Sequence, residues 1–129
     1  MFKIIPKLAY ISAAFFGLTG VILGAMAAHA LEKTLSADSL DSFETAVRFQ
    51  MYHAFFFLFL GLLLEKYDSN LLRLACRFTF SGIVFFSGSI YLLVLTPLKL
   101  GIVTPIGGTL LIIAWGLLLY WAIKLKKND

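Results

Sequence analysis

The sequence predicts an all-α integral membrane protein, a four-helix bundle that crosses the bilayer four times. Three observations support this prediction. Hydrophobic residues make up 60% of the chain and charged residues only 14%, and the mean hydropathy is +0.92, unlike a soluble domain of this size. The charged residues are confined to short stretches at 3–7, 32–48, 65–77, 99 and 124–129. Long apolar stretches separate them, so the charges mark the connections between helices.

Each apolar stretch approaches the length of a membrane-spanning helix. A hydrocarbon core about 30 Å thick requires about 20 helical residues. The expected spans are residues 8–28, 49–64, 78–98 and 105–123. Together they use well over half of the 129 residues, which leaves no room for a separate soluble domain. We therefore expect one domain over residues 1–129, with an amphipathic connection at about 38–48 on the outer side.

The distribution of basic residues predicts that both ends of the chain are cytoplasmic. Eight lysines and arginines fall in the N-terminal stretch, the second connection and the C-terminal stretch, against three in the first and third connections. Membrane proteins usually concentrate basic residues in their cytoplasmic connections. The net charge of +4 therefore indicates topology and contact with anionic lipid headgroups, and we expect no nucleic-acid partner.

Small residues recur along the first expected span. Gly20, Gly24 and Ala28 are four residues apart and share a helix face. Small residues at this spacing let another helix approach closely, which drives packing in lipid. Two interpretations stay open: this face packs against another helix of the same chain, or it forms a homodimer contact. His29 follows at the outer end of the span.

The second expected span begins with an arginine, a glutamine and a histidine. Residues 36–39 should form a loop that ends in a helix cap, with helix then continuing over about 40–64. The apolar part of this helix measures only about 24 Å, so Arg48 should lie at the interface. Gln50 and His53 are three residues apart on one helix face. Because a polar side chain at this depth is costly in lipid, both should point into the bundle.

The third expected span carries its polar and small residues in its outer half, where Ser87, Gly88, Ser89 and Tyr91 lie close together. Serine hydroxyls in membrane helices bond carbonyls of their own or a neighbouring helix, and a glycine beside them permits close approach. We expect this helix to end at Thr96, which precedes a proline.

The fourth expected span begins with Thr104 and Pro105. A threonine cap followed by proline in the first turn is typical of a helix start, so Thr104 is the expected N-cap. Gly108 and Gly116 are eight residues apart and share a face of this helix. They are further candidates for helix packing.

Combined with the expected topology, these positions predict a polar site in the outer half of the bundle. Its candidate residues are His29, Arg48, Gln50, His53, Ser87, Ser89, Tyr91 and Thr104. In one interpretation these side chains hydrogen-bond one another and fix the helix packing. In the other they line an outward-facing cavity for a small molecule, a lipid headgroup, a quinone or a partner segment. A haem site is a special case of this ligand-binding interpretation, with His29 and His53 as iron ligands from adjacent helices.

No set of residues for catalysis or metal binding can be assembled from the sequence. The expected spans contain no Asp or Glu, which disfavours proton-coupled transport. Paired carboxylates, a nucleophile with its base and a phosphate-binding loop are also lacking. Cys76 is the only cysteine, so it cannot form a disulfide within the chain or a structural metal site. We expect neither an enzyme nor a metalloprotein.

Four motifs stand in an order that resembles a known family. They are GAMAAHAL at residues 24–31, FETAVRFQ at 43–50 followed by HA at 53–54, FSGSIY at 86–91, and TPIGG at 104–108 with Trp115. Over nearly the whole chain the sequence is similar to the small four-span family of domain of unknown function 423, with its YgdD- and YwdK-like bacterial proteins and eukaryotic transmembrane protein 256. The resemblance implies an integral inner-membrane protein of four helices without an established activity.

The leading functional hypothesis is a non-enzymatic inner-membrane protein that works as a homo-oligomer or as an accessory subunit of a larger membrane complex. The small size of the chain, the lack of a soluble domain and the glycines on its helices motivate it. The alternative hypothesis is binding of a small molecule, a lipid, a quinone or haem in the polar cluster.

Overall fold

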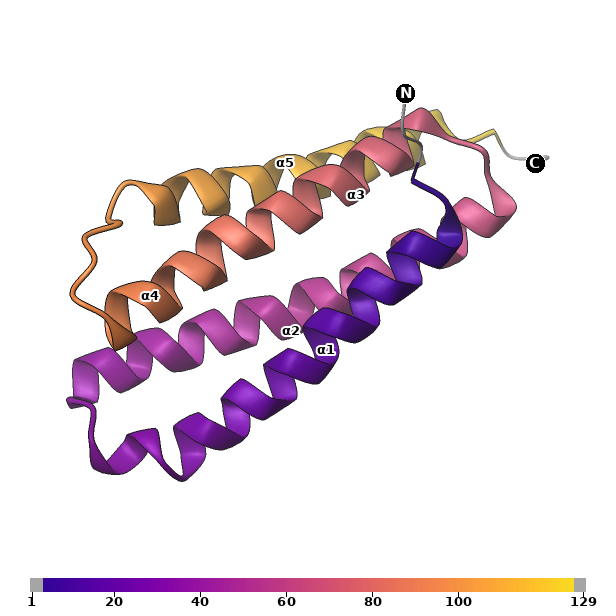
Figure 1. Cartoon of the computed structure of the whole chain (residues 1–129). Coiled ribbons are helices and arrows are strands. Elements are labelled where there is room, and N and C mark those ends of the chain that lie inside the picture. The colour runs from indigo at the N-terminus through magenta and orange to yellow at the C-terminus, as the bar shows by residue number, and fades with distance from the viewer. Residues whose placement is uncertain (1–3, 127–129) are drawn as a thin grey trace.

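The computed structural model describes residues 4–126, which form helices and their connections without a β-strand. The elements are α1 (Pro6–Ala28), a short 3₁₀ turn (Leu31–Lys33), α2 (Ala37–Lys66), α3 (Asn70–Ile83), a π-helical segment (Val84–Gly88), α4 (Ser89–Leu95) and α5 (Val103–Lys124). Because α3, the π-helical segment and α4 follow one another without a break, we call them together the third crossing. The described chain thus has four helices long and apolar enough to cross a membrane, which confirms the predicted all-α fold (Figure 1).

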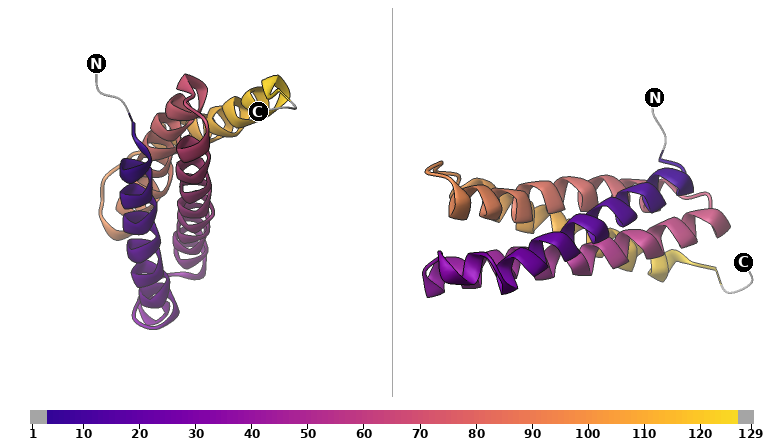
Figure 2. Two further views of the ribbon diagram at one scale, coloured as in Figure 1. Left: turned by 90° about the vertical axis from the view of Figure 1, so that its right-hand side faces the viewer. Right: turned by 60° about the horizontal axis from the view of Figure 1, so that its bottom comes forward.

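The helices run up and down, and the bundle is open at two edges (Figures 1 and 2). Helix α1 packs along α2, and the third crossing packs against both α2 and α5. The edge helices α1 and α5 are therefore the least covered. In the most apolar part of each helix, the buried share of the residues is 44% for α2, 22% for α1 and 17% for α5.

The two ends of the bundle differ in the parts of the chain that they carry (Figure 1). We call the end with the α1–α2 and α4–α5 connections the loop end. The opposite end, which carries the first turn of α1, the α2–α3 turn and the last turn of α5, is the terminal end. The basic residues of the sequence predict that the loop end is outside the cell and the terminal end inside.

Helix α2 runs without interruption from the amphipathic connection into the second crossing. Ser36 caps it, because its Oγ accepts the backbone N–H of Ser39 at 3.1 Å. The cap therefore lies at the beginning of the expected loop and not at its end. The thirty residues of α2 extend about 45 Å, more than the hydrocarbon thickness. Phe43 and Ala46 in the first turns are fully buried, so this lead-in packs against the bundle.

The third crossing is interrupted by the π-helical segment Val84–Gly88, which the sequence did not predict. Helix α5 approaches it with Gly107. A Cβ at Gly107 would overlap the backbone nitrogen of Phe86 and would lie 2.5 Å from the carbonyl carbon of Phe85. Only a residue without a side chain permits this contact between two backbones. Such π-helical turns are rare and often mark positions where function or close packing redirects a helix.

Three of the six small residues predicted to pack do contact another helix. A Cβ at Gly20 would lie 2.5 Å from the Met51 sulfur, and one at Gly24 would lie 3.4 Å from Val47 Cγ1. A Cβ at Gly108 would lie 3.6 Å from the Phe86 ring. The first two contacts join α1 to α2. At Gly20 and Gly24, the small residues of the first span therefore pack against another helix of the same chain.

The other three small residues make no such contact, so their assignment to packing between helices of this chain is wrong. Ala28 is exposed at the end of α1. A Cβ at Gly88 or Gly116 would find no other atom within 4 Å. Periodicity places Gly116 on the same face as Gly108, but the close contacts of α5 with the third crossing lie at Gly107, which meets the π-helical segment, and at Leu111, which lies over Gly82.

Candidate polar site

Gln50 joins three helices in the middle of the membrane-spanning region. Its Nε2 donates to the carbonyl oxygen of Phe16 at 2.9 Å and to Thr19 Oγ1 at 2.8 Å, both on α1. Its Oε1 accepts from the Tyr91 hydroxyl of α4 at 2.6 Å. The side chain is 3% exposed, and both amide N–H groups are used. Gly20 makes room for this arrangement, since a Cβ there would approach Gln50 Nε2 at 3.4 Å.

His53 lies one turn further along the same face of α2 and contacts α5. Its Nε2 lies 3.0 Å from Trp115 Nε1, and its Nδ1 lies 2.7 Å from the carbonyl oxygen of Phe49. Because an indole nitrogen only donates and a carbonyl oxygen only accepts, Nε2 must be the acceptor and Nδ1 must carry the proton. The contacts therefore require a neutral imidazole with both nitrogens occupied. The Trp115 ring also stacks on Phe56, with 4.0 Å between centroids.

The two serines of the third crossing bond different neighbours. Ser87 Oγ donates to the carbonyl oxygen of Ala46 on α2 at 2.7 Å. Ser89 Oγ lies 3.0 Å from the carbonyl oxygen of Phe86 and 2.5 Å from Thr104 Oγ1 on α5. A serine has one hydroxyl proton, so Thr104 donates when Ser89 bonds the carbonyl. Both serines are almost fully buried, so the Ser87 bond lies inside the protein, while the bond between Ser89 and the half-buried Thr104 lies nearer the surface.

Thr104 does not cap α5, which corrects the expected helix start. The helix begins at Val103 with Ile102 at the cap position, and no side chain bonds the first N–H groups. The threonine hydroxyl instead faces Ser89 of the third crossing. A hydroxyl at this depth gains more from a buried partner on the adjacent helix than from a helix end already near water. The sequence pattern of threonine and proline was right about the place of the helix start and wrong about the role of the threonine.

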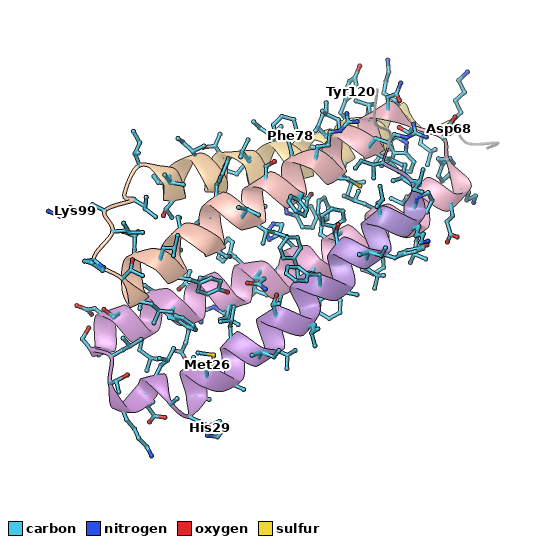
Figure 3. All side chains as sticks on the ribbon, in the orientation of Figure 1. Met26, His29, Asp68, Phe78, Lys99 and Tyr120 are labelled. Carbon is cyan, nitrogen blue, oxygen red and sulfur yellow. The ribbon has the colours of Figure 1, made fainter. Side chains whose placement is uncertain are left out.

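The remaining two candidates lie apart from the others. His29 is exposed just beyond α1 and projects away from the bundle (Figure 3). Arg48 is also exposed, and its Nη2 donates to Thr45 Oγ1 at 2.9 Å on the same helix. We therefore define the polar cluster as Gln50, His53, Ser87, Ser89, Tyr91 and Thr104. It extends from the start of α5 to the middle of the bundle.

The histidines do not fit a haem held between two imidazoles. Gly20 of α1 lies opposite Met51 of α2, so the α1 residues at the level of His53 precede Gly20. His29 lies at least nine residues further along α1, about 14 Å by helical rise. Both nitrogens of His53 also have partners within the chain. In addition, no group of three or more metal-binding side chains lies together anywhere in the described residues.

Within the described chain, the cluster has no unused polar atom to offer a ligand. Every buried side-chain nitrogen and oxygen among residues 4–126 has a hydrogen-bond partner. Six hydrogen bonds of the cluster join different helices. They link Gln50 to Phe16, Thr19 and Tyr91, His53 to Trp115, Ser87 to Ala46, and Ser89 to Thr104. In membrane proteins such bonds contribute on average about 0.6 kcal/mol each. Chemically, the arrangement fixes the relative positions of all four crossings.

Sequence reasoning missed two members of this network, Thr19 and Trp115. Thr19 accepts from Gln50 and itself donates to the carbonyl oxygen of Phe15 at 2.9 Å. Trp115 lies near the middle of α5, away from the interfaces where tryptophan is usually found. An indole N–H at that depth needs an acceptor. The position of Trp115 was therefore a signal that could have pointed to His53.

Comparisons with known proteins agree on one family. The model of the family described as "Protein of unknown function (DUF423)" matches residues 23–108. A UPF0382 membrane protein of Staphylococcus aureus is 41% identical over 92% of this chain and 97% of its own length. The UPF0382 inner membrane protein YgdD of Escherichia coli K12 is 37% identical over 92% of this chain and 91% of its own length. No solved structure matches the chain.

Proposed function

The chain belongs to the DUF423 family and is an integral, multi-pass inner-membrane protein, and from this premise we propose that it is a non-enzymatic subunit. It acts as a homo-oligomer or as an accessory subunit of a larger membrane complex. The observation that carries the proposal is the polar cluster, whose hydrogen bonds run between helices of the chain itself. A site built for a ligand would keep donors or acceptors available for it.

The open edges of the bundle support assembly with another chain. Helices α1 and α5 each pack mainly on one neighbour and are the least covered of the four crossings. Both edge helices also carry a glycine at which a Cβ would find open space. Gly116 is exposed on α5, and Gly17 is half-buried beside a groove between α1 and α2. Glycines on a lipid-facing surface let a second helix approach closely. A partner that covers α1 or α5 would complete the packing of the bundle.

Disulfide cross-linking in native membranes tests this proposal. The buried Cys76 is first replaced by alanine, and a single cysteine is then introduced by Gly17→Cys on α1 or Gly116→Cys on α5. Ala114→Cys is the matched control, because Ala114 is fully buried on the packed face of α5. We expect a covalent dimer or an adduct with a second protein from at least one edge position and none from the control.

Native mass spectrometry of the unmodified protein in mild detergent provides the second readout. A mass of two or more copies, or of a complex with another membrane protein, is the expected result. A monomer in detergent together with no cross-linked product from either edge helix contradicts the proposal.

Ligand binding beside the polar cluster is a second candidate function, and one observation favours it. A cavity of about 230 Å³ lies between α1 and the third crossing, and Thr19, Gln50 and Tyr91 contribute to its wall. Solvent extraction and an absorption spectrum of the purified protein test this function. A quinone or another small molecule that co-purifies, and that is lost in Gln50→Leu, supports it. Extracts that hold only bulk lipid, with no change in Gln50→Leu or His53→Ala, count against it.

A further inference from the structure

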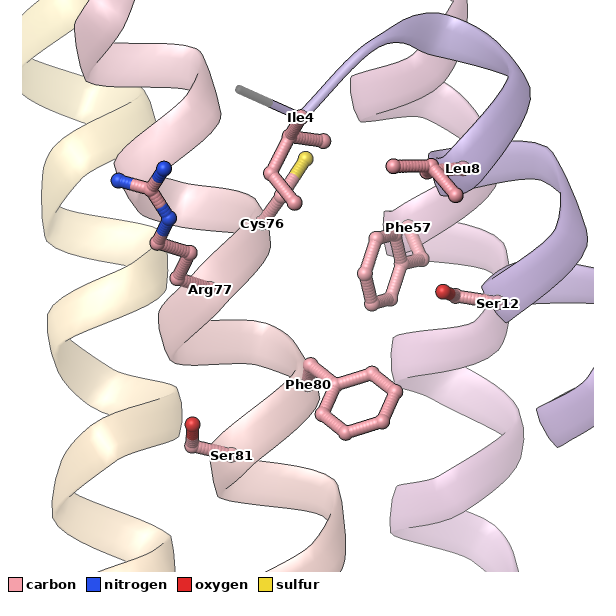
Figure 4. A pocket seen from close by; sticks show the side chains of 8 residues that line it. All are labelled: Ile4, Leu8, Ser12, Phe57, Cys76, Arg77, Phe80 and Ser81. Atoms are coloured by element: carbon pink, nitrogen blue, oxygen red, sulfur yellow. The ribbon is translucent and has the colours of Figure 1, made fainter. Parts of the chain in front are cut away.

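A second cavity, separate from the polar cluster, opens near the terminal end of the bundle. It measures about 320 Å³ and lies between α1, α2 and α3, where Leu8, Phe57 and Phe80 form apolar walls. Figure 4 shows the two phenylalanine rings beside this space, with Ser12 on α1 and Ser81 and Arg77 on α3. Its volume is within the range of small ligand sites, about 300–1,000 Å³. We call it the inner crevice.

Contacts between α1 and α3 bound the inner crevice at both ends. Towards the terminal end, Arg73 Nε of α3 donates to the carbonyl oxygen of Ile4 at 3.1 Å, just ahead of α1. Towards the middle of the bundle, the rings of Phe16 and Phe80 meet edge to face with 5.3 Å between centroids. The Phe16–Phe80 contact lies between the inner crevice and the cavity beside Gln50. The inner crevice is therefore a bounded site of its own.

The position of Arg77 matches the level of lipid headgroups. From Arg77 to the end of the third crossing at Leu95 the helix extends about 27 Å, close to the hydrocarbon thickness of about 30 Å. Arg77 thus lies at the boundary between headgroups and acyl chains when Leu95 lies at the opposite boundary. Phe80 is nearly one turn deeper, so the apolar walls of the inner crevice lie at the level of the acyl chains.

The charge at this end complements an anionic lipid. Among the described residues, those at the terminal end include six basic and two acidic residues, a net charge of +4. Those at the loop end carry three basic and four acidic residues, a net charge of −1. A guanidinium group has five N–H donors in a planar fork that fits a phosphate. A basic residue next to an anionic membrane surface contributes about 1 kcal/mol to lipid binding.

We propose that the inner crevice binds one anionic phospholipid, with its phosphate at Arg77 and the first part of an acyl chain between Leu8, Phe57 and Phe80. Ser12 and Ser81 line the same space at the level of these apolar walls. The preference for an anionic headgroup comes from the arginine and the surrounding positive charge, and the affinity for a diacyl lipid comes from the apolar walls. This site does not depend on the polar cluster or on oligomerisation.

Native mass spectrometry with defined lipids tests the proposal on the full chain. The protein in mild detergent is titrated with phosphatidylglycerol and, in parallel, with phosphatidylcholine, and the fraction with one bound lipid is measured. We expect one phosphatidylglycerol to bind more tightly than phosphatidylcholine. Arg77→Gln should weaken phosphatidylglycerol binding by about fivefold. Lys124→Gln, which removes the same charge from the last turn of α5, should change it by less than about twofold.

A second variant tests the apolar part of the site without changing the charge. Ser12→Phe should fill the inner crevice and weaken the binding of phosphatidylglycerol, even if Arg77→Gln fails to fold. Soluble glycerol phosphate should not compete, because it lacks the acyl chain. Equal binding of the two lipids, equal effects of Arg77→Gln and Lys124→Gln, undiminished binding to Ser12→Phe, or full competition by glycerol phosphate would each overturn the proposal.

Discussion

Replacing Gln50 by leucine should measurably loosen the bundle. The substitution keeps a side chain of similar size at a 3% exposed position, so it creates little cavity. It removes the two bonds to Phe16 and Thr19 and the bond from Tyr91. Three interhelical bonds at about 0.6 kcal/mol each amount to about 2 kcal/mol. The Tyr91 hydroxyl also loses its partner, which raises the expected loss of unfolding free energy to about 2–3 kcal/mol.

The unfolding free energy can be measured in mixed micelles with increasing denaturing detergent. Thr109→Val is the matched control, because this exposed threonine on α5 bonds only a carbonyl of its own helix, at 2.9 Å. A double-mutant cycle with Tyr91→Phe isolates one bond. Tyr91→Phe alone should cost about 0.6–1.7 kcal/mol, and it should cost much less when Gln50→Leu is already present. A Gln50→Leu protein within about 0.5 kcal/mol of the control, or strict additivity in the cycle, would refute the reasoning.

Two further predictions concern the contacts of α5. Trp115→Phe should keep an aromatic ring against Phe56 but leave His53 Nε2 without its donor. The unfolding free energy in the same assay should therefore fall by about 0.6–1.7 kcal/mol. An unchanged unfolding free energy would show that the indole N–H is not bonded. Gly107→Ala should lower the unfolding free energy by about 1–3 kcal/mol or prevent folding, because the added carbon meets the backbone of the π-helical segment. Gly108→Ala, whose added carbon has its nearest contact at 3.6 Å, should change the unfolding free energy by less than about 0.5 kcal/mol. Equal stability of the two variants would contradict the observed packing.

The positions of the helices could be predicted because lipid imposes a simple rule. A backbone in hydrocarbon must satisfy its own hydrogen bonds, so an apolar stretch of sufficient length between charged residues forms a helix. The same rule identified Gln50 and His53, since a polar side chain within such a stretch has to turn towards other protein. Both are almost fully buried, as this argument requires.

The details of packing could not be predicted because they depend on which helices meet. Gly88 and Gly116 have the residue type of a packing site, but a Cβ at either position would meet no atom of another helix within 4 Å. Gly107 has no distinctive spacing, yet it makes the closest contact with another backbone. The π-helical segment lies against Gly107 and has no counterpart in the hydropathy pattern of the sequence. Likewise, the Thr104 hydroxyl could cap α5 or bond a neighbouring helix, and the presence of Ser89 on the third crossing decides for the bond.

The protonation state of His53 tests most directly whether the polar side chains of the cluster bond neighbouring helices and not a ligand. Nitrogen-15 NMR of the protein in lipid bilayers, with labelled histidine and the Trp115→Phe variant for assignment, distinguishes the two neutral tautomers from the charged ring. The contacts predict a neutral ring protonated at Nδ1, with an unprotonated Nε2 whose signal shifts when the Trp115 indole is removed. A ring protonated at Nε2, or an Nε2 signal that is indifferent to Trp115 but changes when bound small molecules are extracted, would contradict the account.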